Sequence, residues 1–311
     1  MRKVVFLFPG QSSQKQGMLR ELYQESSTVR QTFEEASMLT NYDFRRICFE
    51  DQQEMLRDIS ISAPILLTAS LATFRHFMEN YQATPSFMAG HSLGEYSALT
   101  CAGVFSFETA LSIVIFRAKL AQSVMEEKKG VMTVIYNTPY QEIEELCRTM
   151  RRNGRKVWVS CNNSSVQCCA SGTEEDIALL EKKAAKRGAS YRRIVGNAPF
   201  HSPMMDNAAE PLAEFIGQCK QHPPQYPVIS NWSQKPYHQS SVTGNLFHQL
   251  VHPVKWFQSM DYIKRQHTDI WIELGSGQVL SKLMKTDDYK VHSYELSGDR
   301  KLIETAFHEG R

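Results

Sequence analysis

The chain has 311 residues, of which 42% are hydrophobic and 22% are charged. This length allows either more than one average domain or a single large domain with an insertion, and it is enough to bury a substantial core. Basic and acidic residues are mixed and give a net charge of only +2, which argues against nucleic acid or another polyanion as the main partner.

Short β-rich segments alternate with helix-like segments along most of the chain. Apolar runs closed by glycine or proline are typical of buried strands, and apolar residues at helical spacing are typical of amphipathic helices. The expected elements are a strand at Val4–Phe8, helices at 17–37 and Ile65–Tyr81, the latter with Pro64 in its first turn, an apolar strand at 86–89, helices at 95–102 and Phe107–Met125, and strands at Val228–Ser230 and Ile270–Leu274. This alternation predicts the α/β class.

Residues 128–197 have a different pattern. The expected order is strand, helix, strand, strand, helix, strand, at 131–136, 140–150, 157–161, 167–171, 173–187 and 191–195. This order matches a ferredoxin-like unit. We therefore expect a small subdomain at 128–197, inserted into a large subdomain made of residues 1–127 and 198–311.

The cysteines indicate a reducing compartment. Their number, seven, is odd and no Cys-x-x-Cys occurs, so neither a disulfide framework nor a zinc site is expected. Reduced, mostly buried thiols fit the cytoplasm, and Cys168 and Cys169, adjacent in a strand-like stretch, should point to opposite faces. The N-terminal apolar run is too short for a signal peptide, and no stretch approaches a membrane span, so no membrane partner is expected.

A Gly-x-Ser-x-Gly pentapeptide, Gly90 to Gly94, lies between an apolar strand and a helix. In a nucleophile elbow of this kind the serine stands at the tip of a sharp turn, where a side chain at either flanking position would clash. Ser92 is then a candidate acyl acceptor. A purely structural turn can carry the same five residues, so the motif alone leaves both interpretations open.

A serine hydroxyl needs a base to become a good nucleophile, and the chain has ten histidines. His91 is adjacent to Ser92, but neighbours on a sharp turn diverge, so His91 is poorly placed to take the proton. His201 lies in a polar, proline-containing segment at the exit of the expected insertion, and catalytic groups collect on such loops. Periodicity alone does not choose among the ten.

Acyl transfer also needs donors for the oxygen that becomes negative. The amide of Leu93, directly after the candidate nucleophile, is one such donor. Gln11 lies in the glycine-led loop after the first strand. It either supplies the second donor or is a plain loop residue. Arg117 lies in an otherwise apolar helical stretch, where its guanidinium either reaches out to water or meets a carboxylate in a pocket.

Six segments, in this order and spacing, resemble malonyl-CoA:acyl carrier protein transacylases. They are Phe8–Gln14, Gly90–Tyr96, Phe116–Arg117, Pro199–Ser202, Gln249–Trp256 and Glu273–Leu280. The resemblance runs from about residue 3 to residue 285, nearly the whole chain. It implies an α/β-hydrolase-like core with a ferredoxin-like insert, which agrees with the pattern at 128–197.

The resemblance also implies the catalytic roles. Ser92 is the nucleophile and His201 its base, and a backbone carbonyl of the Gln249 segment orients the histidine in place of an aspartate. The amides of Gln11 and Leu93 form the oxyanion hole. The implied reaction moves a malonyl group from malonyl-CoA to Ser92 and then to the phosphopantetheine thiol of an acyl carrier protein, with no metal and no redox cofactor.

Substrate contacts are implied in the same way. Arg117 would bind the free carboxylate of the malonyl group, and His91 and Gln249 would contribute to the substrate site. Phe200, directly before the base, is the aromatic residue that accompanies malonyl in this family, because a phenyl ring leaves little room for an α-methyl group. The branched side chain of Leu93 favours the same choice.

Three departures from the family pattern leave the pathway open. Ser12-Ser13 stand where many members have Gly-Ser, residues 162–167 lack the usual Pro-Gly, and Ser276 replaces a proline. A fatty-acid enzyme and a free-standing transacylase serving a polyketide synthase both fit, and a monomer is expected. Two alternatives to the transacylase are a hydrolase that clears acyl groups from carrier proteins, for which a carboxylate-binding Arg117 has no use, and a non-catalytic carrier-protein docking module.

Overall fold

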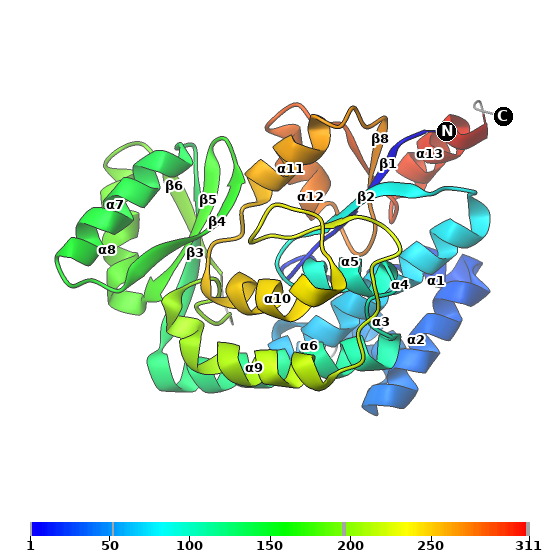
Figure 1. The fold of residues 1–311 in the computed structure, drawn as a ribbon, viewed down its shortest axis with the longest axis horizontal. Coiled ribbons are helices and arrows are strands. Elements are labelled where there is room, and N and C mark those ends of the chain that lie inside the picture. The colour runs from blue at the N-terminus through cyan, green and yellow to red at the C-terminus, as the bar shows by residue number, and fades with distance from the viewer. Residues whose placement is uncertain (1, 52, 195–196, 309–311) are drawn as a thin grey trace.

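The computed structural model describes residues 2–51, 53–194 and 197–308, and it contains one parallel and one antiparallel β-sheet, each packed against helices (Figure 1). The predicted α/β class is therefore confirmed. Among the residues in these ranges, no helix combines the length and the apolarity that a membrane span requires.

The parallel sheet has the strand order β7-β2-β1-β8-β9. Its strands are β1 (Val4–Phe8), β2 (Pro85–Gly90), β7 (Val228–Ile229), β8 (Ile270–Glu273) and β9 (Val291–Ser293). All five residues of β1 are buried, as expected for a central strand of a parallel sheet. Because β1 pairs in parallel with β2 and β8, the loops after these three strands begin at the same edge of the sheet.

The helices outside residues 130–194 surround the parallel sheet (Figure 1). They are α1 (Arg20–Glu25), α2 (Ser27–Thr40), α3 (Phe44–Glu50), α4 (Ile59–Asn80), α5 (Gly94–Cys101), α6 (Phe107–Lys128), α9 (Asp206–Gln218), α10 (Val242–Val251), α11 (Trp256–Lys264), α12 (Val279–Lys285) and α13 (Ser297–His308). Helix α5 begins at Gly94, shortly after β2 ends at Gly90, so it starts at the strand edge where the loops meet, and it packs against both β1 and β2.

The antiparallel sheet has the order β4-β5-β3-β6. Its elements are β3 (Gly130–Tyr136), α7 (Tyr140–Arg152), β4 (Val157–Ser164), β5 (Gln167–Thr173), α8 (Glu174–Ala185) and β6 (Ser190–Ile194). Helices α7 and α8 lie on the side of this sheet that faces away from the parallel sheet, and they close a small core of their own (Figure 1). The opposite face carries Met132 and Val134, which join the main core.

The antiparallel sheet is tied to the segment that precedes α11. The amide of Asn162 in β4 donates to the carbonyl of Val254 at 2.8 Å, and the amide of Val254 donates to the carbonyl of Ser160 at 2.9 Å. This two-way contact fixes the inner edge of the antiparallel sheet against the segment between α10 and α11.

Two helix predictions were wrong in their bounds. The helix expected at 17–37 is interrupted at Ser26, whose side chain accepts from the amide of Val29 and caps a new helix. The helix expected from Ile65 begins earlier, at Ile59, so Pro64 lies inside it. The helix survives because a proline removes only one intrahelical hydrogen bond, and the burial of α4 outweighs that loss. The predicted end of the last small-subdomain strand, Val195, lies outside the described residues.

Candidate active site

Ser92 lies on the sharp turn between β2 and α5, with a positive φ of 54°. The turn is crowded on both sides. A Cβ atom on Gly90 would overlap the carbonyl of Gly94, and one on Gly94 would overlap the carbonyl of Phe8. Only glycine fits at either position, which is the steric reason that the elbow motif implies. The turn therefore holds Ser92 in a strained conformation at the strand edge.

The hydroxyl of Ser92 contacts His201. Ser92 Oγ lies 2.6 Å from His201 Nε2, and His201 Nδ1 lies 2.6 Å from the carbonyl oxygen of Gln249. Because a carbonyl only accepts, the Nδ1 atom carries the proton and the Nε2 atom is free to accept the serine proton. Burial, followed by the nearby charges, lowers the pKa of His201 to about 3, so the imidazole is neutral at neutral pH. Of the ten histidines, this is the one that contacts Ser92 Oγ.

Gln249 contacts both members of this pair. Its backbone carbonyl accepts from His201, and its side-chain Nε2 donates to the backbone carbonyl of Ser92 at 2.7 Å. Gln249 comes from α10 and is buried. One residue of one helix thus sets the position of the elbow relative to the imidazole.

Two backbone amides beside Ser92 are free to bind an oxyanion. The amides of Gln11 and Leu93 have no hydrogen-bond acceptor within the described part of the chain. Gly10 brings them together, because a Cβ at that position would overlap the carbonyl of His91 and lie 3.5 Å from the amide nitrogen of Leu93. Two convergent N–H groups next to a serine hydroxyl are the usual form of an oxyanion hole.

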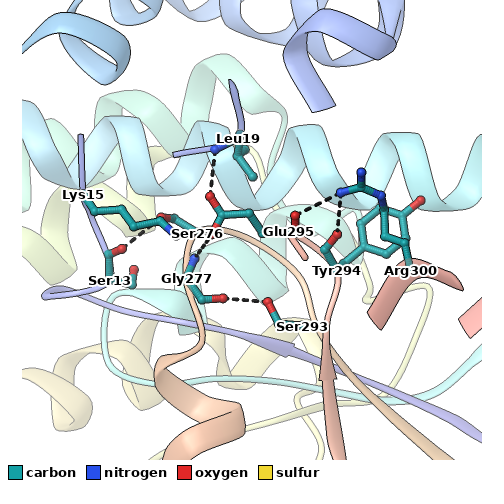
Figure 2. A network of polar contacts seen from close by, with 9 residues as sticks. All are labelled: Ser13, Lys15, Leu19, Ser276, Gly277, Ser293, Tyr294, Glu295 and Arg300. Atoms are coloured by element: carbon teal, nitrogen blue, oxygen red, sulfur yellow. Dashed lines mark hydrogen bonds and ion pairs between the residues drawn. The ribbon is translucent and has the colours of Figure 1, made fainter. Parts of the chain in front are cut away.

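A polar network behind the loop that follows β1 holds this loop in place (Figure 2). The carboxylate of Glu295 accepts from the amides of Leu19 at 2.8 Å and Gly277 at 2.6 Å, and it pairs with Lys15 at 2.9 Å. Ser276 donates to the carbonyl of Ser13 at 2.9 Å. The serine that replaces the usual proline therefore makes a buried hydrogen bond to the loop that carries Gln11.

Arg117 is buried within α6, with 1% of its surface exposed. Its guanidinium carbon lies 4.2 Å from the centre of the Phe200 ring and 5.6 Å from that of Tyr96. Its three side-chain nitrogens lack a hydrogen-bond partner within the described ranges. Burial lowers its pKa. The alternative in which Arg117 reaches out to water is wrong, and a buried cation with free donors is suited to binding an anion.

His91 and Phe200 lie in the same site. His91 Nε2 is 2.9 Å from Asn163 Oδ1 of β4, and its ring packs edge-on against Trp256 at 5.3 Å. This contact directs His91 away from the hydroxyl of Ser92, as expected for neighbours on a sharp turn. Phe200 shields Arg117, so the guanidinium lies behind the ring rather than at the wall of the cavity.

A cavity of about 520 Å³ lies between the two sheets in front of Ser92. Among its lining residues are Gln11, His91, Ser92, Phe200 and His201. The side chain of Leu93 is buried and does not line this cavity, so its branched shape has no direct contact with a ligand there. Because β3, β4, β5 and β6 all contribute to the opposite wall, a bound acyl group would touch both parts of the chain.

A family model for the acyl transferase domain matches residues 5–296. The chain belongs to the acyl transferase family. It is 35% identical to the malonyl CoA-acyl carrier protein transacylase of Bacillus subtilis, a match that covers 95% of this chain and 74% of the relative.

Two solved structures resemble this acyltransferase over nearly their whole length. FabD from Acinetobacter baumannii superposes with a TM-score of 0.94 at 32% identity, covering 100% of this chain and 99% of the other. A malonyl-transacylase solved in complex with its type II PKS acyl-carrier protein superposes with a TM-score of 0.92 at 32% identity, covering 99% of each chain.

Two polar residues of the acyltransferase site were not predicted from the sequence. Asn231 accepts from the amide of Ser92 at 2.8 Å and donates to the carbonyl of Gly90 at 2.7 Å, so it holds the elbow from the side of β7. Glu95 accepts from the amide of Asn231 at 2.8 Å and from Tyr237 at 2.7 Å. Burial raises the pKa of Glu95 to about 7. Asn231 comes just after the short buried strand β7. Its position after a buried strand was the feature of the sequence that could have indicated a role at this edge of the sheet.

Proposed function

We propose that this acyltransferase moves a malonyl group from malonyl-CoA to the phosphopantetheine thiol of an acyl carrier protein through an ester on Ser92. The observation that carries this proposal is the combination of a serine–histidine pair with a buried guanidinium that lies behind Phe200 of the same cavity and has no hydrogen-bond partner among the described residues. The relatives named malonyl CoA-acyl carrier protein transacylase support the choice of donor and acceptor.

In the first half of the reaction, Ser92 Oγ attacks the thioester carbonyl while Nε2 of His201 takes its proton. The negative oxygen of the tetrahedral intermediate accepts from the amides of Gln11 and Leu93, which need not reorganise because they have no other acceptor among the described residues. The intermediate then releases CoA as a thiol, which regains the proton from His201, and a malonyl ester remains on Ser92.

In the second half, the thiol of the carrier protein enters by the same route and His201 takes its proton. Thiolate attack on the ester yields the malonyl thioester, and His201 returns the proton to the departing Ser92 Oγ, which regenerates the free serine. In this cycle the malonyl group moves from sulfur to oxygen and back to sulfur, and nothing is oxidised or reduced. We therefore propose that the enzyme uses no metal and no redox cofactor. We further propose that it acts as a monomer in the cytoplasm.

Substrate selection is proposed to lie in Arg117 and Phe200. A charged carboxylate gives Arg117 hydrogen bonds that the described residues do not supply, and a bidentate pair of this kind favours malonyl over uncharged acyl groups. Phe200 would have to turn or shift to expose the guanidinium, because its ring lies directly over it. A hydrolase acting on uncharged acyl groups would leave this buried cation without a use.

We also propose finer assignments for the fold. The large subdomain, residues 1–127 and 198–311, is taken as α/β-hydrolase-like, which the elbow between a parallel strand and a helix supports. The small subdomain, residues 128–197, is taken as ferredoxin-like. The element order β3-α7-β4-β5-α8-β6 and the antiparallel order β4-β5-β3-β6 support this assignment.

The test is the mass of the intact protein after mixing with malonyl-CoA in the absence of a carrier protein. The wild-type chain is expected to gain one malonyl group, and Ser92→Ala is expected to gain none. Ser112→Ala, which removes an exposed serine of α6, serves as the control and should be acylated like the wild type. An adduct that persists in Ser92→Ala would refute the proposed nucleophile.

A further inference from the structure

Two cysteines face each other on neighbouring strands of the antiparallel sheet. Cys161 of β4 is the register partner of Cys169 of β5. Directly opposed residues of an antiparallel pair have Cα atoms about 4.5–5.5 Å apart, which lies within the roughly 4.4–6.8 Å span that a disulfide bridges. Their side chains also share one face of the sheet. The register therefore places the two residues within the Cα separation that a disulfide bridges.

An irregularity in β4 aims Cys161 at this face. The register shifts between Val159 and Cys161, and such a bulge changes the face to which the following residues point. Val159 accordingly packs in the small core under α7 and α8, whereas Cys161 and Cys169 join the main core. Cys168, next to Cys169 in β5, points into the small core, as the sequence predicted for adjacent strand residues.

Both thiols line the cavity that contains Ser92. They are themselves buried, with 2% and 6% of their surfaces exposed, but the same cavity is also lined by Arg192 and Lys282, which are exposed at the surface. A small reagent that enters where an acyl group enters would thus reach them. Cys168 does not line this cavity.

The two thiols have different surroundings. The amide Nδ2 of Asn163 donates to Cys169 Sγ at 3.4 Å. The thiol of Cys161 and this amide lower the pKa of Cys169, whereas contact with Cys169 and burial raise the pKa of Cys161. Burial also raises the pKa of Cys168. Since the thiolate is the reactive form and the Asn163 amide donates to Cys169 Sγ, we assign Cys169 as the attacking sulfur and Cys161 as the neighbour that completes a disulfide.

We propose that Cys161 and Cys169 form an oxidisable dithiol in the acyl cavity, a modification site for small peroxides. The thiolate of Cys169 attacks one peroxide oxygen, the O–O bond breaks, and Cys169 becomes a sulfenic acid while an alcohol or water leaves. Cys161 then attacks that sulfur, the S–S bond forms and water is released. Two thiols are oxidised by two electrons and one peroxide is reduced.

The disulfide would also act on acyl transfer, a consequence that rests on the proposed function. Asn163 is shared, since its Nδ2 contacts Cys169 and its Oδ1 contacts His91, the neighbour of Ser92. Formation of the S–S bond would shift Cys169, which is both part of the cavity wall and the partner of Asn163 Nδ2. We expect oxidation to lower the rate of Ser92 acylation several-fold, and a dithiol reductant to restore it.

The experiment treats the folded, reduced chain with hydrogen peroxide, blocks the remaining thiols, and analyses tryptic peptides by mass. Trypsin leaves Cys161, Cys168 and Cys169 on one peptide, residues 157–182, so the disulfide appears as the loss of two hydrogen atoms from this peptide. Variants then identify the partners. The loss is expected to persist in Cys168→Ser, the matched control, and to disappear in Cys161→Ser and in Cys169→Ser.

The opposite results would overturn the proposal. These are an internal disulfide that persists in Cys169→Ser, one that disappears in Cys168→Ser, or a peptide that gains oxygen atoms without losing hydrogens. Cys161→Ala and Cys169→Ala repeat the test if a serine variant does not fold by circular dichroism. The peptide mass does not depend on acyl transfer, so a failure of the proposed function would leave this readout intact.

Discussion

Replacement of Arg117 by methionine should make the protein more stable and less active with malonyl-CoA. Arg117 is fully buried and its donors have no partner among the described residues, so the resting enzyme bears the cost of an unpaired buried cation. Replacement of buried ion pairs by well-packed apolar residues of similar volume is neutral or stabilises proteins by about 1–4 kcal/mol. Methionine fills most of the space between Phe200 and Tyr96, so we expect Arg117→Met to gain free energy of unfolding within that range.

The loss of function can be worked from the same contacts. Hydrogen bonds to charged groups contribute about 1.5–3 kcal/mol each, so losing a bidentate carboxylate pair costs about 3–6 kcal/mol before other groups adjust. Because about 1.4 kcal/mol corresponds to tenfold, kcat/KM for malonyl-CoA should fall by at least about 100-fold. Transfer of acetyl, which has no carboxylate, should be unchanged or faster.

The assay compares kcat/KM for malonyl-CoA and acetyl-CoA in the wild type and in Arg117→Met, together with urea unfolding of both proteins. Arg117→Lys is the control that keeps the charge but loses the planar fork. Its kcat/KM for malonyl-CoA should lie between those of the wild type and Arg117→Met. An equal loss for both acyl groups would refute the proposed carboxylate contact. A less stable Arg117→Met would refute the argument that the cation is unpaired in the resting enzyme.

Two further predictions concern specificity and pH. Phe200→Ser should raise the use of methylmalonyl-CoA relative to malonyl-CoA by about 10–200-fold, the value of one methyl group in a pocket, and an unchanged ratio of kcat/KM would contradict this. Glu95→Gln should alter the pH dependence of stability. Burial raises the pKa of Glu95 from 4.5 to about 7. The folded chain therefore binds a proton at Glu95 more tightly than the unfolded chain does. The stabilisation that results is complete below pH 4.5 and is lost as the pH rises through 7. The stability of Glu95→Gln relative to the wild type, measured by urea unfolding, should therefore increase by about 3 kcal/mol between these limits, and a pH-independent difference would show that Glu95 does not titrate there.

Local features of the sequence were sufficient to predict a sharp turn at residues 90–94, whereas the choice of a nucleophile elbow over a purely structural turn came from the resemblance. The glycines are required by close contacts, that of Gly90 within the motif and that of Gly94 with Phe8 of the adjacent strand. The α/β class and the order of elements after residue 128 followed from the periodicity of apolar residues, which is also a local feature of the sequence. Element bounds at Ser26 and Pro64 could not be predicted, because a capping hydroxyl and the burial of α4 decided them.

Contacts between distant segments had to come from the structure or from resemblance. Periodicity could not select His201 among ten histidines, since its selection depends on α10 placing the Gln249 carbonyl behind it. The second contact of Gln249, through its side chain, had no signal in its own segment. Likewise the bulge in β4 that turns Cys161 toward the cavity is a property of strand pairing, which spacing along one strand does not reveal.

The acceptor behind His201 belongs to the peptide backbone and is therefore present whichever side chain occupies position 249. A carboxylate in this place could be lost by a single codon change or neutralised by acid, whereas a peptide carbonyl can be neither. The orientation of the imidazole thus depends on where α10 sits and not on the chemistry of a third side chain. Changes that shift this helix, even at a distance from the cavity, should affect the reaction more than acidification of the medium does.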